Sequence, residues 1–503
     1  MSIIQSSEFE LLARLRSIFP KESQIYLVGG AVRDILLSKP FHDLDFVLPN
    51  HAIEAARKTA NTLKAAYFTL DSERDIGRVI YSRSDGKRIA LDFSAIRGAS
   101  LEEDLQSRDF TINAMAMPLH PPTRLIDPLG GVLDLRGHHI RACRASSFQE
   151  DPNRILRALR HAAALEFHIL PETRRWMRQA LPLLPGVSPE RIRDELFRAL
   201  EGPRPAAFLR SAEIMGVLSV LFPELASLKN ISQPPPHQQD AWNHTLDVLQ
   251  KLEAVLNVLT GEFIEEKAAN WAMGFLSLRL GRFRSQIQDH IDASLSPERS
   301  RKGLLFWSAL YHDVAKPETI QIDAHQRIRF FEHENIGAER IAERGHSLHL
   351  SNHEIDLSST IVRNHMRPLH LAQGSIAPSR RAIYRYFRDC GSAGIDIGLL
   401  SLADVLATYG PTLPQEKWER HLDIVRALFE AWWEKAETTI SPPPMINGNQ
   451  LMQKFSLKPG PLIGQLLEAL REAQVEGLVA DQEEAFQYAA NWLEQASDRP
   501  APL

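Results

Sequence analysis

Two aspartates that stand two residues apart carry the clearest chemical signal in the sequence. Asp43 and Asp45 lie in a short apolar run that ends at Leu48. Successive side chains of a β-strand alternate between its two faces, so both carboxylates would project from one face. Two negative charges at this spacing repel each other unless a cation or a proton lies between them. Oxygen-only ligands suit Mg²⁺ that is held partly by substrate phosphates, so the pair predicts a magnesium site for a phosphate-bearing molecule.

Two further features extend this candidate site. Gly29 and Gly30 lie between a predicted strand at 25–28 and a predicted helix. At such a junction the backbone can approach a ligand closely, and helix amides favour phosphate. Asp92, in a later predicted strand, is a candidate third acid that converges from a neighbouring strand. The alternative for Asp92 is a surface acid on an edge strand.

A second group of residues predicts a different metal site further along the chain. His312 and Asp313 are adjacent at the end of an apolar segment that begins at Leu304. Other candidate ligands precede and follow them, namely His244, His333, His365 and Asp404. Adjacent His and Asp on buried helices, joined by His and Asp from other helices, suit a divalent metal that supports hydrolysis. One buried histidine is more often a core residue, but the ordered set favours metal binding.

The composition is that of an ordinary soluble protein. The chain has 503 residues, 44% of them hydrophobic, and at roughly 100–200 residues per domain we expect about three or four domains. Lys and Arg number 58 against 63 Asp and Glu, a net charge of −5, so any nucleic-acid contact must come from a local patch. The two cysteines, Cys143 and Cys390, exclude a disulfide scaffold. We see no signal peptide and no apolar run of the roughly 20 residues that span a bilayer, and expect a cytoplasmic protein without membrane contact.

The elements that must position these residues change character along the chain. Short strands are predicted at 25–28, 44–48, 78–81 and 89–93, and a helix at 31–37. From about Asp151 onward the pattern is helical. We therefore expect an α+β head, with a mixed sheet and helices, followed by an all-helical body.

An acid and a guanidinium mark the first helix of that body. Asp151 and Arg154 are predicted one helical turn apart on its polar face, together with Arg157 and His161. A carboxylate accepts from an exocyclic amine and a guanidinium donates to ring acceptors, so the couple complements the Watson–Crick edges of C and A. Each good bidentate pair discriminates by about 1–3 kcal/mol. The alternative is an i,i+3 salt bridge on a solvated helix.

Five segments, in order, resemble the motifs of class II tRNA nucleotidyltransferases, the family of CCA-adding enzymes and bacterial poly(A) polymerases. They are Leu27–Asp34 with Asp43–Asp45, Leu101–Ala116, Ile126–Leu135, Glu150–Arg160 and Ser188–Leu196. Five motifs in the family's order make the resemblance specific.

This resemblance implies a polymerase-β-like head and names its site residues. Asp43 and Asp45, with Asp92 beside them, would hold the Mg²⁺ ions that activate an RNA 3′-hydroxyl for attack on an α-phosphate. The implied nucleotide contacts are Gly29, Gly30, Arg33, Arg108, Asp109, Asn113, Asp151, Arg154, Arg157 and Arg160. The Asp151–Arg154 couple would be the protein template that selects CTP or ATP. Asp109 could equally be the structural partner of an arginine, and the helical count rotates Arg160 well away from Asp151.

The histidine–aspartate set resembles an HD-domain phosphohydrolase. The matching ligands of a divalent metal are His244, His312, Asp313 and Asp404, and the extra ligands of two-metal members are His333 and His365. Phosphoester hydrolysis by this domain and a role as a scaffold for the tRNA both stay open. The expected domains are a nucleotidyltransferase head at 1–145, a helical neck at 146–232 that binds nucleotide and RNA, an HD domain at 233–412 and a helical tail at 413–503. We assign no chemistry to the tail, which could cradle the tRNA.

Two departures from the family pattern bear on the product. Ser107 stands where the family usually has an arginine before Arg108, which would trim the phosphate contacts. Only Phe93–Leu101 separates Asp92 from Glu102. Members that add the whole CCA triplet commonly carry a longer flexible segment there, and members that add only CC lack it. Addition of the terminal A is therefore in doubt, and the open alternatives are a compact member that carries out all three additions and an enzyme that adds only A.

The expected activity is that of a template-independent RNA 3′-nucleotidyltransferase, which adds C and/or A from CTP and ATP to tRNA or another RNA 3′ end. Phosphohydrolysis in the HD domain would be an additional activity. The alternatives are a CC-adding enzyme, a poly(A) polymerase, and an HD phosphohydrolase whose head only grips RNA. The sequence gives no indication of the oligomeric state.

Overall fold

The structure is a computed structural model that describes residues 6–40, 43–83, 88–122, 124–261, 270–373 and 377–497. The chain divides into two compact units. Unit 1 comprises Met1–Glu195 and Ser211–Leu221, and unit 2 comprises Leu196–Arg210 and Phe222–Leu503. The division falls inside two helices, α9 (Pro189–Leu200) and α10 (Pro205–Met215).

Unit 1 is built on a six-stranded sheet with the strand order β3-β4-β5-β2-β1-β6. Its strands are β1 (Tyr26–Val28), β2 (Asp43–Leu48), β3 (Ala66–Asp71), β4 (Ile76–Ser82), β5 (Arg88–Ala95) and β6 (Ala116–Pro118). β2 and β5 are parallel, and the other neighbours are antiparallel. The predicted strands and helix are confirmed to within two residues at each end. The sequence missed β3, a mostly exposed edge strand without apolar alternation, and β6, which has only three residues.

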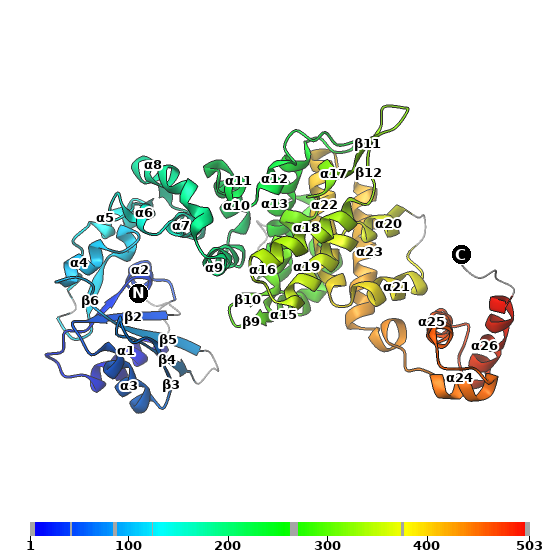
Figure 1. Cartoon of the computed structure of the whole chain (residues 1–503), viewed down its shortest axis with the longest axis horizontal. Coiled ribbons are helices and arrows are strands. Elements are labelled where there is room, and N and C mark those ends of the chain that lie inside the picture. The colour runs from blue at the N-terminus through cyan, green and yellow to red at the C-terminus, as the bar shows by residue number, and fades with distance from the viewer. Residues whose placement is uncertain are drawn as a thin grey trace. The chain divides into compact units, whose positions relative to one another are not determined.

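The two faces of this sheet have opposite character. Phe46 of β2 and Phe93 of β5 stack with their ring centroids 5.0 Å apart. They belong to an apolar core shared with α1 (Ser6–Ile18) and α3 (Ala52–Leu63), which lie on one side of the sheet (Figure 1). Because side chains alternate along each strand, the three aspartates of the candidate site project from the opposite face.

Short elements that carry the sequence motifs pack on that opposite face. Val28 and Val47 contact Leu105 and Ala114 there. The remaining elements of unit 1 are α2 (Gly30–Leu36), α4 (Leu101–Gln106), η1 (Thr111–Asn113), α5 (Gly131–Arg136), β7 (His139–Ile140), α6 (Ser147–Glu150), α7 (Arg154–Leu165), β8 (His168–Ile169), α8 (Pro171–Ala180), η2 (Leu181–Gly186) and α11 (Val217–Leu221). Helix α4 begins after Ser100, whose side chain accepts from the Glu103 amide and caps the helix.

Unit 2 is mostly helical within its described residues. It contains α12 (Pro223–Ala226), α13 (Ala241–Thr260), α14 (Trp271–Leu280), η4 (Gly281–Phe283), α15 (Arg284–Asp292), β9 (Ser294–Ser296), β10 (Arg299–Ser300), α16 (Arg301–Tyr311), α17 (Lys316–Thr319), β11 (Ile320–Ile322), β12 (Ile328–Phe330), α18 (His333–Ser347), α19 (Asn352–Asn364), α20 (Arg367–Gln373), α21 (Arg380–Cys390), α22 (Ala393–Tyr409), η5 (Gly410–Thr412), α23 (Gln415–Trp433) and the π-helical turn η6 (Ala436–Ile440). Helix α22 packs against α13, α19 and α23. Ala393–Thr412 is long and apolar enough to cross a membrane by composition, but 83% of its apolar window is buried in the protein, as in the core helix of a helical domain.

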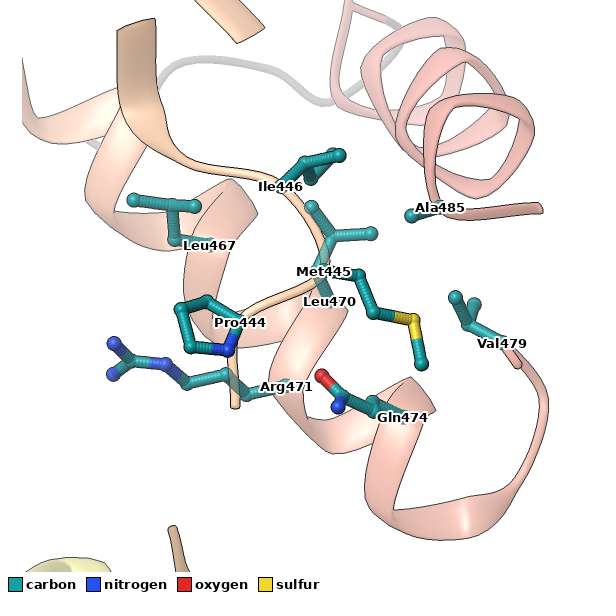
Figure 2. Close-up of a pocket in the computed structure, with 9 residues that line it drawn as sticks. All are labelled: Pro444, Met445, Ile446, Leu467, Leu470, Arg471, Gln474, Val479 and Ala485. Carbon is teal, nitrogen blue, oxygen red and sulfur yellow. The ribbon is translucent and has the colours of Figure 1, made fainter. Parts of the chain in front are cut away.

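Three further helices end the described chain, α24 (Gly448–Phe455), α25 (Pro461–Glu476) and α26 (Gln482–Ser497). Met445 and Ile446, which precede α24, lie against Leu470 of α25 and Ala485 of α26 (Figure 2). The cavity between these side chains measures about 20 Å³, which is room for no more than a water-sized group. This cavity is therefore too small for a nucleotide.

Candidate functional site

Three acids meet on one face of the sheet in unit 1. Asp45 of β2 and Asp92 of β5 are direct partners in the parallel register, and Asp43 lies two residues before Asp45. Arg78 of β4 donates to both carboxylate oxygens of Asp92 at 2.8 Å. The structure thus places the three predicted acids together and places Asp92 on an inner strand, where an arginine compensates its charge.

The pKa of Asp45 is raised to about 6. Burial is the largest cause, the charge of Arg108 acts against it, and the negative charges of Asp92 and Asp43 raise the pKa further. A cation at this face would relieve the repulsion between the carboxylates. The donor set therefore fits a divalent metal that prefers oxygen ligands.

Gly29 forms a tight turn beside Asp45 and the guanidinium of Arg108. Its φ is +74°, a conformation that favours glycine. A Cβ at this position would lie 3.2 Å from Nη1 of Arg108 and 3.2 Å from Oδ2 of Asp45. A side chain here would thus be strained and would crowd both charged groups. Gly30 follows as the first residue of α2.

A chain of hydrogen bonds connects α2 with α7. Nη1 of Arg33 donates to Oδ1 of Asn113 at 2.9 Å, and the Asn113 amide donates to Oδ1 of Asp109 at 3.2 Å. Oδ2 of Asp109 accepts from Nε of Arg157 at 3.0 Å. Burial would raise the pKa of Asp109, but the charge of Arg157 and the hydrogen bond from Asn113 hold it below its ordinary value. Asp109 is therefore the partner of an arginine, the alternative that the sequence left open.

Arg154 reaches the loop that carries Arg108. Its Nη2 donates to the backbone oxygen of Ser107 at 3.1 Å, and its Nη1 lies 3.5 Å from the backbone oxygen of Arg108. The Arg108 side chain in turn lies beside Gly29 and lowers the pKa of Asp45 by its charge. The acidic face and Arg154 are thus joined through one short segment of unit 1.

Asp151 lies outside the helix, contrary to the prediction. Helix α7 begins at Arg154, and Asp151 has φ −146° and ψ 92°, an extended conformation. Pro152 explains the difference, because a residue that precedes proline is disfavoured in helical backbone. The Asp151 carboxylate accepts from Nη2 of Arg191 at 2.7 Å, while Nε of Arg154 is 4.0 Å away. Asp151 and Arg154 are therefore neighbours that form only a loose ion pair.

The side of α7 predicted to be polar is also not solvated throughout. His161 is 7% exposed and packs edge-on against Phe110 with ring centroids 5.9 Å apart. The sequence placed His161 on the polar face because it counted helical angles alone. The packing of Phe110 turns that face toward the protein interior.

Glu195 of α9 joins the two remaining arginines. It accepts from Nη1 of Arg157 at 2.7 Å and from Nε of Arg160 at 2.8 Å. Burial would raise the pKa of Glu195, but the charges of Arg160 and Arg157 hold it below its ordinary value. The sequence did not single out Glu195 or Arg191 as site residues. Their only signal was membership of the fifth motif.

The second predicted constellation converges inside unit 2. Asp313 stands at its centre, with one carboxylate oxygen 3.2 Å from Nε2 of His312 and 3.8 Å from Nε2 of His244. The other oxygen is 3.6 Å from Nε2 of His333 and 3.9 Å from Nε2 of His365. Asp404 completes the set, since its Oδ1 lies 3.0 Å from Nε2 of His244. All six predicted residues are thus brought together: five form two groups that share Asp313, and Asp404 joins them through His244.

The histidine rings in this cluster are oriented by the backbone. Nδ1 donates to a carbonyl oxygen in three of them, His312 to Ala309, His333 to Phe330 and His365 to Val362. A donor hydrogen on Nδ1 leaves the Nε2 lone pair for a metal, which is the usual arrangement of histidine ligands. Among the described residues the buried Nε2 of His312 accepts or donates no well-aligned hydrogen bond, and the Asp313 oxygen 3.2 Å away is its ionic neighbour. The arrangement therefore fits a divalent metal.

The electrostatics of the cluster agree with this orientation. Burial and the charges of His333 and His312 lower the pKa of His365 to about 3, so its ring is neutral near pH 7. Burial would raise the pKa of Asp313, but the charges of His312 and Lys316 hold it well below its ordinary value. The neutral ring of His365 and the ionised carboxylate of Asp313 are forms that bind a metal. Burial would lower the pKa of His312, but the charge of Asp313 raises it above its ordinary value.

A sheet with paired acids on an inner strand, followed by helices and a His/Asp cluster, defines a nucleotidyltransferase head joined to an HD-type metal domain. Family models match accordingly: "Poly A polymerase head domain" at 25–141, "Probable RNA and SrmB- binding site of polymerase A" at 166–229, "HD domain" at 276–409 and a tRNA nucleotidyltransferase domain 2 at 436–490. The chain belongs to the tRNA nucleotidyltransferase family.

Two relatives establish this membership. The chain is 31% identical to the A-adding tRNA nucleotidyltransferase of Deinococcus radiodurans, over 93% of this chain and 95% of the relative. It is 32% identical to the CC-adding tRNA nucleotidyltransferase of Thermus thermophilus, over 94% of both chains.

Solved structures share the fold. The complex of a CCA-adding enzyme with CTP matches with a TM-score of 0.60 at 21% identity, covering 98% of this chain and 100% of the other. The Thermotoga maritima CCA-adding enzyme complexed with tRNA matches with a TM-score of 0.58 at 21% identity, covering 98% and 97%.

Proposed function

We propose that this enzyme adds C and/or A from CTP and ATP to the 3′ ends of tRNA without a nucleic-acid template. The observation that carries this proposal is the position of Arg108. Its side chain lies against Gly29 beside Asp45, and its backbone, with that of Ser107, accepts from Arg154. A single bound nucleotide can therefore reach the acidic face with its phosphates and the base-reading arginine with its base.

Some of the site residues would bind Mg²⁺ or the phosphates, and the others would position them. Asp43 and Asp45 would hold Mg²⁺, with Asp92 beside them, and bound Mg²⁺ supplies the charge that makes the RNA 3′-hydroxyl more acidic and neutralises the phosphates. Arg33 and Arg108, at the Gly29–Gly30 turn, would contact the triphosphate. The remaining contacts, Asp109, Asn113, Arg157 and Arg160, hold one another through the network described above, so they position the nucleotide site.

Base selection would fall to Asp151 and Arg154. The Asp151 carboxylate accepts from the exocyclic amine of C or A, and the Arg154 guanidinium donates to the ring acceptor beside it. Arg191 holds Asp151 in an extended segment at 2.7 Å. Asp151 lies outside α7 and its partner Arg191 belongs to α9. The distance between the Asp151 carboxylate and the Arg154 guanidinium can therefore change on nucleotide binding without unwinding α7.

The connection between β5 and α4 favours an enzyme that stops after CC. Strand β5 ends at Ala95 and α4 begins at Leu101. Within this short connection the Arg97 amide donates to Asp104 at 3.0 Å and the Ala99 amide donates to Glu103 at 2.8 Å. Both ends of the loop are thus tied to α4, which leaves little length for the flexible segment of members that add the whole CCA triplet.

One assay tests both the activity and the product. Purified full-length protein with Mg²⁺ is given tRNA that lacks its 3′ end, with CTP alone, ATP alone, or both, and the products are separated at single-nucleotide resolution. We expect two added nucleotides with CTP and no further band when ATP is present. On this tRNA a third nucleotide with ATP would assign CCA addition, and a ladder would assign a poly(A) polymerase. With tRNA that already ends in CC as a second substrate, one nucleotide added from ATP and none from CTP would assign A addition. No incorporation into either tRNA with either nucleotide would contradict the proposal.

A second candidate function belongs to the HD cluster. The His/Asp cluster borders a cavity of about 1190 Å³ through Asp313, His333 and Asp404, and this cavity has room for an organic phosphoester. We propose metal-dependent hydrolysis of a phosphoester there, with His244, His312, Asp313 and Asp404 as ligands and His333 and His365 as ligands of a second ion. Phosphate release from a chromogenic phosphoester should require added metal and be lost in His312→Ala while CTP incorporation continues. Phosphate release that survives His312→Ala would exclude this site.

The domain limits given by the sequence, 1–145, 146–232, 233–412 and 413–503, and a cytoplasmic location also remain proposals. Family-model matches at 25–141 and 276–409 support the head and the HD domain.

A further inference from the structure

Helix α23 is part of the HD body although no family match covers it. The HD match ends at residue 409 and the next match begins at residue 436, so α23 (Gln415–Trp433) lies between them. Trp418 is fully buried, and its indole donates to the backbone oxygen of Ala272 at 2.9 Å. The helix packs along α14 and α22. Its side chains can therefore line the cavity beside Asp313 and Asp404, here called the HD cavity.

One face of α23 lines that cavity. Lys417, Arg420 and His421 follow the i, i+3, i+4 spacing of one helical face, and all three line the cavity that also contains Asp313 and Asp404. Burial lowers the pKa of His421 to about 4, so it brings no charge near pH 7. The face therefore offers two cations beside an uncharged ring.

The charge of the cavity wall is strongly one-sided. Among the described residues that line it, the cations are Lys316, Arg327, Arg329, Lys417 and Arg420, and the only carboxylates are Asp313 and Asp404. Both carboxylates belong to the metal cluster. The remainder of the cavity therefore attracts an anion, because nothing else on its described wall compensates the cations.

Among the described residues, two of these cations have no side-chain hydrogen bond or ion pair. Lys316 contacts Asp313 at 2.6 Å, Arg329 pairs with Asp323 at 3.5 Å, and Lys417 donates to the Tyr409 hydroxyl at 2.9 Å. Across the ranges that the structure describes, neither Arg327 nor Arg420 forms an ion pair. Arg327 comes from the connection between β11 and β12 and Arg420 from α23, and both residues line the same cavity. The two guanidinium groups thus stand on separate walls with their donors available.

We propose that Arg327 and Arg420 form a second phosphate subsite in the HD cavity. The subsite takes a phosphate group other than the one at the His/Asp cluster, so the preferred ligand is a nucleotide-sized molecule with two phosphate groups. This proposal rests on the phosphohydrolase function proposed above only for its hydrolytic consequence.

The size and lining of the cavity support this ligand class. A volume of about 1190 Å³ exceeds what a single phosphate fills and lies somewhat above the range of about 300–1,000 Å³ for pockets that hold organic ligands. Phe330 and Tyr409 line the same cavity and offer rings on which a base can stack. Guanidinium groups bind phosphate through paired donors, which a lysine ammonium does not provide.

The test compares two ligands that differ by one phosphate. Full-length protein is loaded with Mn²⁺, its head is occupied by a non-hydrolysable CTP analogue, and binding of adenosine 3′,5′-bisphosphate and adenosine 3′-monophosphate is measured by calorimetry. Because a hydrogen-bonded charge contributes about 1.5–3 kcal/mol, the wild-type protein should bind the bisphosphate at least about tenfold more tightly. Arg327→Ala combined with Arg420→Ala should remove most of this preference and leave the affinity for the monophosphate within about twofold.

Arg426→Ala is the matched control. Arg426 lies on the same helix, pairs with Asp423 at 3.3 Å, and does not line the cavity. It should keep the preference for the bisphosphate, and all variants should keep CTP incorporation.

The remaining outcomes separate this proposal from the hydrolase itself. Equal affinity of the wild-type protein for both ligands, or equal loss of both in the double variant, would overturn the second subsite. A preference of the wild-type protein for the bisphosphate, without any phosphate release, would support the second phosphate subsite and contradict the proposed phosphoester hydrolysis. Displacement of the bisphosphate by a short RNA with a 3′-phosphate would assign an RNA end as its source, and lack of displacement would assign a free nucleotide.

Discussion

The carboxylate of Asp109 lies 3.0 Å from Nε of Arg157, and this ion pair connects the loop before η1 with helix α7. The same arginine donates to Glu195 at 2.7 Å, which ties α9 to the pair. Asn113 and Arg33 extend the contact to α2. The residues proposed to form the nucleotide site of unit 1 are thus held by contacts between four separate sequence segments.

Replacement of Glu195 should destabilise unit 1 in a pH-dependent way. Glu195→Gln leaves Arg157 and Arg160 without their shared carboxylate, and we expect a loss of about 2 kcal/mol in the free energy of unfolding at pH 7, reduced from the fully buried case because both arginines are partly exposed. The folded pKa of Glu195 is lowered, so its stabilisation is present above the ordinary value of 4.5 and is lost as the pH falls through the folded pKa. The difference from wild type, measured by urea unfolding, should therefore shrink at acid pH. Glu172→Gln, at an exposed pair on α8, serves as the control and should change stability little at any pH.

Removal of the paired acids should abolish nucleotide transfer. Asp43→Ala with Asp45→Ala removes the oxygen ligands that would hold Mg²⁺, and a loss of at least about a thousandfold corresponds to roughly 4 kcal/mol of transition-state stabilisation. Incorporation of labelled CTP into tRNA measures the effect. Glu73→Ala, an exposed acid at the β3–β4 turn of the same sheet, should keep wild-type activity. Substantial CTP transfer by the double variant would show that the acids do not carry the reaction.

Loss of Asp151 should relax the choice of nucleotide more than the rate. Asp151→Ala removes the acceptor for the exocyclic amine of C, so discrimination between CTP and UTP should fall about tenfold, in line with roughly 1–3 kcal/mol for one bidentate contact. The measurement is the ratio of kcat/KM for CTP and UTP. Arg175→Ala, at an exposed pair on α8, is the control. An unchanged ratio in Asp151→Ala would remove this residue from base selection.

Metal should stabilise the HD domain through the His/Asp cluster. Addition of Mn²⁺ at about a hundred times its Kd should raise the free energy of unfolding by about 2.7 kcal/mol, because the metal binds the folded chain. His312→Ala should lose most of this gain and most of the metal found by elemental analysis. His346→Ala, an exposed histidine on α18, should behave like wild type. A metal-induced shift that persists in His312→Ala would place the bound ion elsewhere.

The acidic pair could be predicted from the sequence because it depends on local order within one strand, and the histidine–aspartate set because its order along the chain resembles that of an HD domain. Alternation along β2 fixes the common face of Asp43 and Asp45 wherever the strand packs, since it is a property of the extended backbone. The sequence also carries the ordered motifs, which indicated the family.

The partners of the charged residues were decided only by tertiary structure. Pro152 keeps Asp151 out of α7, and Arg191, which lies far along the chain, holds it instead. Glu195 had no signal of its own, because its role comes from two arginines that α9 meets only after folding. In the same way Arg420 gained its place in the HD cavity from the packing of α23, since residue spacing describes one helix face but not what that face is packed against.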